Sequence, residues 1–211
     1  MKFYVAKTPK LLKWVFKSKI WEVKTNQKEV FLTFDDGPTP EVTDFVLGQL
    51  KRHKAKASFF CIGKNIRQHP EILNRIKDHG HTIGNHTYNH YNCLKHSLET
   101  YLDNIRLTEE LLKRHTTNTK KLFRPPYGRI SPKATKELQK QGYQIIMWDV
   151  LSADFDTSNT AEQCVKNVIK NITPGSIVVF HDSLKSYPIL KDTLPSVLNE
   201  LKKMGYQCSA L

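Results

Sequence analysis

The sequence predicts an α/β fold in which parallel strands alternate with helices. Short apolar runs are separated by amphipathic segments, glycines stand where helices pass into strands, and polar residues follow most of the apolar runs. Alternation of this kind implies roughly seven parallel strands joined by right-handed crossovers. A closed barrel and an open doubly wound sheet both satisfy the pattern.

The predicted strands are the apolar runs at 29–34, 57–62, 81–84, 120–123, 143–148 and 176–180, together with the stretch after Gly205. Helices are expected between them, because residues 42–50, 98–112 and 190–201 each carry apolar side chains at helical spacing. These segments predict the three longest helices.

Helix ends are marked by residues with special backbone chemistry. Ser131-Pro132 predicts an N-cap followed by proline in the first turn, and Thr160 opens a sequence of capping-box form. Gly80, Gly142 and Gly205 each follow a helical tail, where glycine adopts the left-handed conformation without steric cost. About six helices are therefore expected in all.

The 211 residues suit a single domain, which we place at 29–211, because no break in composition suggests a second. Residues 1–28 are expected to form a basic strap or short helix packed on that domain, with a position on a membrane surface as the alternative. Lysines interrupt the apolar stretch, so it lacks the core of a secretory signal. No apolar run reaches the ~18 residues of a membrane span, and the cytoplasm is the default expectation.

The net charge of +13 would suit nucleic acid or an anionic envelope. The basic residues are scattered and no nucleic-acid-binding motif accompanies them, so we expect no nucleic-acid partner and a monomeric protein, with peripheral envelope contact left open. The four cysteines form no CxxC pair and are expected to be free thiols.

Ionisable residues follow five of the predicted strands. They are Asp35-Asp36, "NHTYNH" at 85–90, "RPPYG" at 124–128, "WDVLSADF" at 148–155, and His181-Asp182. Because the carboxyl ends of parallel strands lie at one edge, these groups are expected to converge on a single mouth.

His86 and His90 are four residues apart, a spacing that places both imidazoles on one face of a helical turn. Two histidines and one aspartate are the ligand set of catalytic zinc sites and of non-haem iron sites. Asp35 and Asp36 cannot point the same way on a pleated strand, so one is expected to bind the metal while the other takes a proton from water.

Two further groups complete the predicted chemistry. Arg124 would hold the free aspartate by a bidentate contact, and a protonated His181 would give a proton to a leaving amine. This arrangement, with a base and an acid on opposite sides of a carbonyl held by a metal, is suited to amide hydrolysis.

The motifs "TFDDGP", "HTYNH", "RPPYG", "WDVLSADF" and "VVFHDS" resemble, in order and spacing, the five motifs of the polysaccharide deacetylase family, the NodB-homology domain of carbohydrate esterase family 4. The resemblance runs from about residue 29 to the C-terminus. It implies an α/β fold of NodB-homology type, a distorted (β/α) barrel of about seven parallel strands. It also implies a metal-dependent carbohydrate deacetylase, with zinc or another divalent ion such as cobalt or manganese.

The family pattern assigns a role to most of the candidate residues. Asp35 resembles the catalytic base and Asp36 a metal ligand beside His86 and His90. Arg124 resembles the arginine that positions the base, the backbone N–H of Tyr127 the oxyanion donor, and His181 the catalytic acid. The resemblance also implies a substrate pocket, for which we select Pro126, Trp148, Phe155 and Val179.

The fourth motif departs from the family pattern, which often reads D-S-x-D-W. Leu151 replaces the aspartate that would tune the acid histidine, and Phe155 replaces the tryptophan. Asp149 and Asp154 are both candidates to tune His181 instead.

We therefore expect a hydrolase of carbon–nitrogen bonds other than peptide bonds. Its expected substrate is an N-acetylated oligo- or polysaccharide, such as the N-acetylglucosamine units of peptidoglycan or of a chitin-like glycan. The alternative is a catalytically weakened, carbohydrate-binding member of the same fold. A non-haem iron oxygenase has the same ligand types, but its ligands usually come from a jelly-roll sheet.

Overall fold

A computed structural model of the chain describes residues 5–115 and 120–211. Its helices and strands, in chain order, are α1 (Lys10–Val15), β1 (Glu29–Asp35), α2 (Val42–Arg52), β2 (Ala57–Cys61), α3 (Gly63–Gln68), α4 (Pro70–Asp78), β3 (Thr82–Asn85), η1 (Cys93–Lys95), α5 (Leu98–His115), β4 (Lys121–Phe123), η2 (Pro126–Gly128), α6 (Pro132–Lys140), β5 (Tyr143–Ile145), β6 (Val150–Leu151), α7 (Ala161–Ile169), β7 (Ile177–His181), α8 (Tyr187–Lys203) and β8 (Gln207–Cys208).

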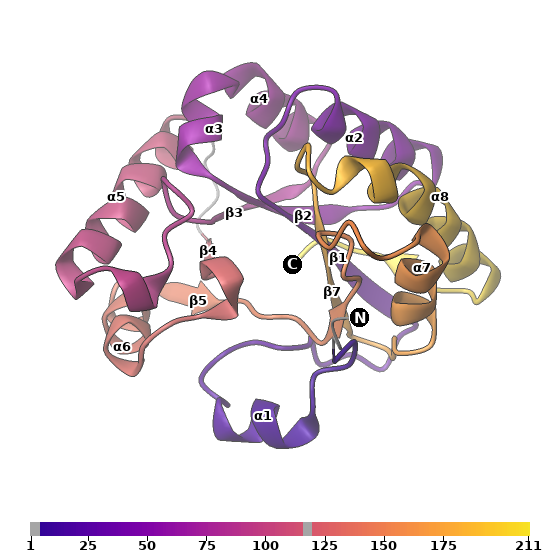
Figure 1. Cartoon of the computed structure of the whole chain (residues 1–211), viewed down its shortest axis with the longest axis horizontal. Helices are drawn as coiled ribbons and strands as arrows, with labels where there is room; N and C mark the ends of the chain where they lie inside the picture. Colours follow the sequence, from indigo (N-terminus) through magenta and orange to yellow (C-terminus); the bar gives the residue numbers. More distant parts are fainter. Residues whose placement is uncertain (1–4, 116–119) are drawn as a thin grey trace.

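The strands form one parallel sheet in the order β5-β4-β3-β2-β1-β7-β6, and β8 pairs with the start of β1. Figure 1 shows the sheet curled, with the larger helices arranged around its outside. The seven strands make a half-barrel, which confirms the predicted α/β fold.

The alternation of side chains along β1 separates the core from the site. Val30, Leu32 and Phe34 are fully buried in the main core cluster, which also contains side chains of α2 and α8. The intervening positions Phe31, Thr33 and Asp35 point to the concave side, because successive side chains on a strand face opposite ways. Phe31 packs there with residues of β2, β4 and β7.

The predicted helix ends are confirmed. The Ser131 side chain accepts a hydrogen bond from the N–H of Ala134, and Thr160 forms a complete capping box with Gln163. The three predicted helix-ending glycines have φ of 71°, 83° and 76°, in chain order. The four cysteines are free and buried, as expected.

One strand prediction was too long. The run 143–148 forms a strand only as far as Ile145, and a separate strand, β6, follows at Val150–Leu151. Between them the chain crosses from one edge of the half-barrel to the other, where the N-terminal segment 5–23, which includes α1, contacts it. Ile20 forms a parallel bridge with Ile146, and Lys7 forms an antiparallel bridge with Val150.

The N-terminal segment thus lies across the opening between β5 and β6. Besides these backbone bridges, it places the ammonium groups of Lys7 and Lys13 on the fully buried carboxylate of Asp149, which also accepts a hydrogen bond from Ser176. In residues 5–115 and 120–211, no helix combines the length and the apolar character needed to cross a bilayer.

We expect Asp149→Asn to lower the free energy of unfolding by about 2 kcal/mol, because the change removes the anion that compensates two lysines. The loss should be smaller than for a fully buried pair, since Lys7 retains 34% side-chain exposure. Chemical denaturation followed by circular dichroism measures it. Glu137→Gln, which breaks an exposed pair with Lys140, is the control and should change stability by less than about 0.5 kcal/mol. Equal effects of the two variants would contradict the role given to Asp149.

Candidate active site

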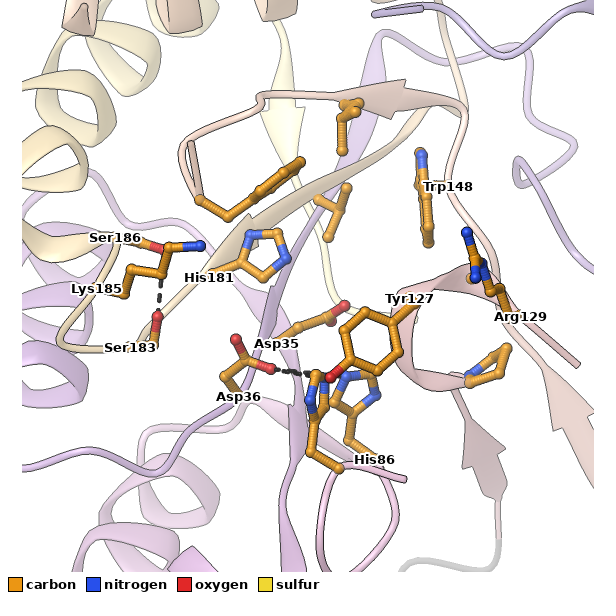
Figure 2. Close-up of a pocket in the computed structure, with 16 residues that line it drawn as sticks. Asp35, Asp36, His86, Tyr127, Arg129, Trp148, His181, Ser183, Lys185 and Ser186 are labelled. Atoms are coloured by element: carbon orange, nitrogen blue, oxygen red, sulfur yellow. Dashed lines mark hydrogen bonds and ion pairs between the residues drawn. The ribbon is translucent and has the colours of Figure 1, made fainter. Parts of the chain in front are cut away.

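A pocket of about 610 Å³ opens at the carboxyl ends of the strands, where the sequence predicted convergence. It is lined by Asp35, Asp36, His86, His90, Pro125, Tyr127, Gly128, Arg129, Trp148, Leu151, Phe155, Val179, His181, Ser183, Lys185 and Ser186. Figure 2 shows the carboxylates and imidazoles directed into this one space.

Three of the four side chains predicted for the substrate pocket, Trp148, Phe155 and Val179, line it. Pro126 does not: it is buried at the start of η2, and the preceding Pro125 faces the pocket instead. The proline pair enters a tight turn here, so only one of the two rings can reach the cavity.

Asp36, His86 and His90 offer one ligand atom each, and these atoms all lie within 4.8 Å of one another. Oδ1 of Asp36 is 3.7 Å from Nε2 of His86 and 3.3 Å from Nε2 of His90. Two ligands that are each about 2.1 Å from a tetrahedral zinc ion stand roughly 3.4 Å apart. The spacing therefore fits a shared cation.

Two other observations agree with a cation at this position. Oδ1 of Asp36 is buried and has no hydrogen-bond partner among the described residues, a costly state for an anion unless a cation compensates it. Nδ1 of His86 lies 2.7 Å from the carbonyl oxygen of Arg124, which leaves Nε2 free to bind metal. Burial lowers the pKa of His86 to about 3, with His90 adding to the effect, so the imidazole is in the neutral form that ligates.

The prediction that a helical turn brings the two histidines together is wrong. His86 directly follows β3, and the chain to His90 is an irregular loop whose next helical turn begins only at Cys93. Thr87 and His90 have φ of 64° and 55°, and this left-handed backbone turns the second imidazole back toward the first, with ring centroids 5.1 Å apart.

Strained backbone is concentrated around the pocket. Of the seven non-glycine residues with positive φ in the described chain, five lie in loops that follow strand ends of the site: Asp36, Thr87, His90, Tyr127 and Ala153. Each such residue costs on the order of 1 kcal/mol. The surrounding structure, rather than local preference, therefore fixes these loops.

Asp35 lies beside the three candidate metal ligands, which we call the ligand trio, and is held by Arg124. An N–H of Nη1 of this fully buried arginine donates to Oδ1 of Asp35 at 2.7 Å, and another donates to Thr33 at 2.6 Å. The contact has a single point, so the predicted bidentate geometry is wrong, because the other guanidinium donors bind the carbonyl oxygens of Ile146 and Met147. The network still fixes the carboxylate and keeps a positive charge next to it.

His181 lies opposite Asp36 across the pocket and next to Asp35, because Asp35 and His181 are register partners on the adjacent strands β1 and β7. Nδ1 of His181 is 2.8 Å from Oδ1 of Asp154, whose Oδ2 accepts the backbone N–H of His181. Burial by itself lowers the pKa of His181. The charge and hydrogen bond of Asp154, together with the charges of Asp36 and Asp35, outweigh this effect and raise the pKa to about 9.

The structure thereby separates the two candidates for the missing fourth-motif aspartate. Asp154 contacts His181, whereas Asp149 binds the N-terminal lysines, so the suggestion that Asp149 tunes the acid does not hold. Leu151, at the place of the family aspartate, lines the pocket, and Phe155 packs edge-on against His181 with centroids 5.2 Å apart.

The turn that carries Tyr127 has φ 60° and ψ 11° at that residue. Tyr127 is 61% exposed, and its ring lies next to that of His90, with ring centroids 4.6 Å apart. The side chain thus forms part of the pocket rim, while the turn sets the direction of the backbone N–H.

Sequence reasoning missed several pocket residues. Arg129, Ser183, Lys185 and Ser186 lie at the rim, and only their position just after the motifs could have indicated it. It also missed the role of buried Asp182, which accepts hydrogen bonds from the N–H of Gly37 and from Thr43 and so fixes the turn after Asp36. Burial raises the pKa of Asp182 to about 8.

A carboxylate and two imidazoles arranged around one point, beside a fixed carboxylate and a histidine paired with aspartate, define the class of metal-dependent hydrolases. The comparisons give the family. The sequence model for polysaccharide deacetylase matches residues 22–146. The chain therefore belongs to the polysaccharide deacetylase family (NodB homology, carbohydrate esterase family 4).

Two curated relatives are both named peptidoglycan-N-acetylglucosamine deacetylase of Bacillus cereus. One is 39% identical over 181 residues, which are 85% of this chain and 66% of the relative, so the chain spans just under two thirds of its length. The other is 38% identical over 192 residues, which are 89% of this chain and 88% of the relative.

A solved structure is similar over almost the whole chain. It is the Bc1960 peptidoglycan N-acetylglucosamine deacetylase in complex with a hydroxamate-type benzamide, and the TM-score is 0.88 at 36% identity. The match covers 97% of this chain and 95% of that one. It includes the fourth and fifth motifs, which lie beyond residue 146, where the family match ends.

Proposed function

We propose that the chain removes the N-acetyl groups of N-acetylglucosamine units in peptidoglycan, with zinc bound by Asp36, His86 and His90. The observation that carries this proposal is the placement of Asp35 and His181 at neighbouring strand ends, in the pocket that also holds three candidate ligand atoms within 4.8 Å of one another. The names of the relatives supply the substrate.

A divalent ion at the trio would act as a Lewis acid toward water and the acetyl carbonyl. Asp35, held by Arg124, accepts the proton of the attacking water as the bond from oxygen to the carbonyl carbon forms. The N–H of Tyr127 donates a hydrogen bond to the oxygen on which negative charge develops. His181 then gives its proton to the sugar nitrogen as the carbon–nitrogen bond breaks, and Asp154 stabilises its charged form before transfer.

Apolar side chains shape the part of the pocket that would hold the acetyl methyl group. Leu151, Phe155 and Val179 line it next to His181, and Trp148 forms a wall further along.

Acetate release from intact peptidoglycan, from glycan strands freed of peptides and from chito-oligosaccharides tests the function. We expect acetate to be released and free amino groups to appear on the sugars that were N-acetylglucosamine. Binding of these glycans with no acetate release at any pH between 5 and 10 would favour the carbohydrate-binding alternative. The altered fourth motif is the observation behind that alternative, and the contact between Asp154 and His181 weakens it.

Two exposed cations, Arg129 and Lys185, flank opposite sides of the pocket in Figure 2. Neither forms an ion pair with another residue of 5–115 or 120–211. Peptidoglycan carries carboxylates on the lactyl group of muramic acid and on its peptides, whereas chito-oligosaccharides are neutral. The pair is therefore suited to an anionic glycan.

We expect Arg129→Gln or Lys185→Gln to raise KM for muramic-acid-containing glycan by about fivefold, with little change for chito-oligosaccharide. Lys191→Gln on α8, outside the pocket lining, is the control for a general loss of positive charge. The same rise for both substrates would show that the two cations do not recognise carboxylates.

A further inference from the structure

Helix α1 presents an apolar surface that no residue of 5–115 or 120–211 covers. None of its residues is buried, and Leu11, Trp14 and Val15 are 71%, 73% and 55% exposed. Their spacing of three and four residues places them on one face. Leu12 and Phe16, each 40% exposed, extend this surface, which we call the α1 patch. Isolated exposed apolar residues are ordinary, but a contiguous group indicates an interaction surface.

The patch is held in place by the rest of the domain. The N–H of Thr8 donates to the carbonyl oxygen of Asp149 at 2.8 Å, Lys13 binds the carboxylate of Asp149, and Nε1 of Trp21 donates to the carbonyl oxygen of Phe16 at 3.2 Å. A six-residue helix is not stable alone in water, so these contacts fix its conformation. The apolar face is therefore held in solvent by the fold, and Figure 1 shows α1 standing apart from the other helices.

The surroundings of the patch are basic. Residues 5–21 contain five lysines and no aspartate or glutamate. Lys10 and Lys17 are exposed beside the patch, and the ammonium of Lys19 lies 4.5 Å from the ring centroid of Phe16. Segments that lie in the interface of an anionic membrane have this composition, with tryptophan and leucine on one face and lysines around them.

We propose that the α1 patch docks this protein on the surface of an anionic lipid bilayer. Leu11, Trp14 and Val15 enter the boundary between headgroups and acyl chains, and Lys10 and Lys17 contact lipid phosphates. Five side chains are far fewer than the roughly 20 residues a side of a stable protein interface, which favours a bilayer over a second copy of the chain. None of the pocket-lining residues belongs to α1, so the α1 patch and the pocket are separate surfaces.

Co-sedimentation of the full chain with vesicles tests the proposal. We expect binding to vesicles of phosphatidylglycerol and phosphatidylcholine and weaker binding to phosphatidylcholine alone. Leu11→Ser combined with Trp14→Ser should lower the partition coefficient by about tenfold or more. Lys10→Gln and Lys17→Gln should each lower it by about fivefold on the anionic vesicles only. A blue shift of tryptophan emission on anionic vesicles should disappear in Trp14→Phe, which retains binding.

Leu107→Ser, a change at a 42% exposed leucine on α5, is the control and should leave binding unchanged. Acetate release from a soluble chito-oligosaccharide should be the same in all these variants, which keeps this test separate from that of the proposed function. Absence of wild-type binding to anionic vesicles, or equal binding by the double serine variant, would overturn the proposal. So would a concentration-dependent dimer in sedimentation velocity that the double variant lacks, because the patch would then serve self-association.

Discussion

Asp36→Ala should abolish binding of the divalent metal and lower the rate of acetate release on the order of a thousandfold. Oδ1 of Asp36 is the atom that both imidazoles approach, at 3.7 and 3.3 Å, so its removal leaves two imidazoles and no carboxylate to compensate the charge of the metal. Metal content by mass spectrometry and acetate release, measured on the same preparation, test both parts. Chelation of the wild type should produce the same loss, and restoration by zinc, cobalt or manganese in parallel would identify the most effective ion.

Asp44→Ala provides a matched control for this prediction. Asp44 is a half-exposed aspartate on α2 that pairs with Arg75 outside the pocket. Its removal should leave metal content and activity unchanged. Full metal content and activity in Asp36→Ala would show that the trio is not the metal site. Loss of activity with full metal content would instead assign Asp36 to another step.

Much of the fold and of the site could be predicted because both follow from rules that act over short stretches. Glycine at helix ends and the capping residues at Ser131 and Thr160 depend only on neighbouring backbone. The division between Asp35 and Asp36 follows from the pleat of β1. Convergence of the motifs follows from parallel strand direction, which the alternation of strands and helices already implies.

The features that could not be predicted depend on loop conformation and on contacts between distant segments. Both Asp149 and Asp154 stand near the fourth motif, and only the turn at Ala153, with φ 64°, brings Asp154 to His181. Asp149 is occupied by lysines more than 130 residues away in sequence. No periodicity in the sequence marks such a partner.

The His86–His90 loop illustrates the same point. The spacing of four predicted that the two imidazoles approach one point, which the structure confirms, but the helical turn expected between them is absent. Hydrogen bonds fix the loop: the N–H of Thr87 donates to the side-chain oxygen of Asn85, and that of Tyr91 donates to Thr87. Spacing alone therefore predicted that these two side chains lie close together, and not the backbone that presents them.

Asp154→Asn should move the alkaline limb of the pH–rate profile to lower pH by more than about one unit. His181 acts as an acid and must be protonated, so wild-type activity should fall as pH rises through about 9, the raised pKa of this histidine. Asparagine cannot supply the negative charge, and burial, the largest influence on this group, then lowers the pKa. Rates of acetate release between pH 5 and 10, at saturating metal, measure the shift.

The free energy of unfolding should also fall as the pH rises through the pKa of His181. The folded pKa of His181 is raised above 6.5, so its pairing with Asp154 contributes stability that is fully present below pH 6.5 and is lost as pH rises through about 9. Asp154→Asn should therefore destabilise the fold more at pH 6 than at pH 9.5.

Asp156→Asn, two residues along the same loop and outside the pocket lining, is the control for the pH–rate profile and should leave the alkaline limb in place. An unshifted limb in Asp154→Asn would mean that His181 is not the group that titrates in the reaction, because Asp154 is the carboxylate that hydrogen-bonds its imidazole and contributes most to raising its pKa.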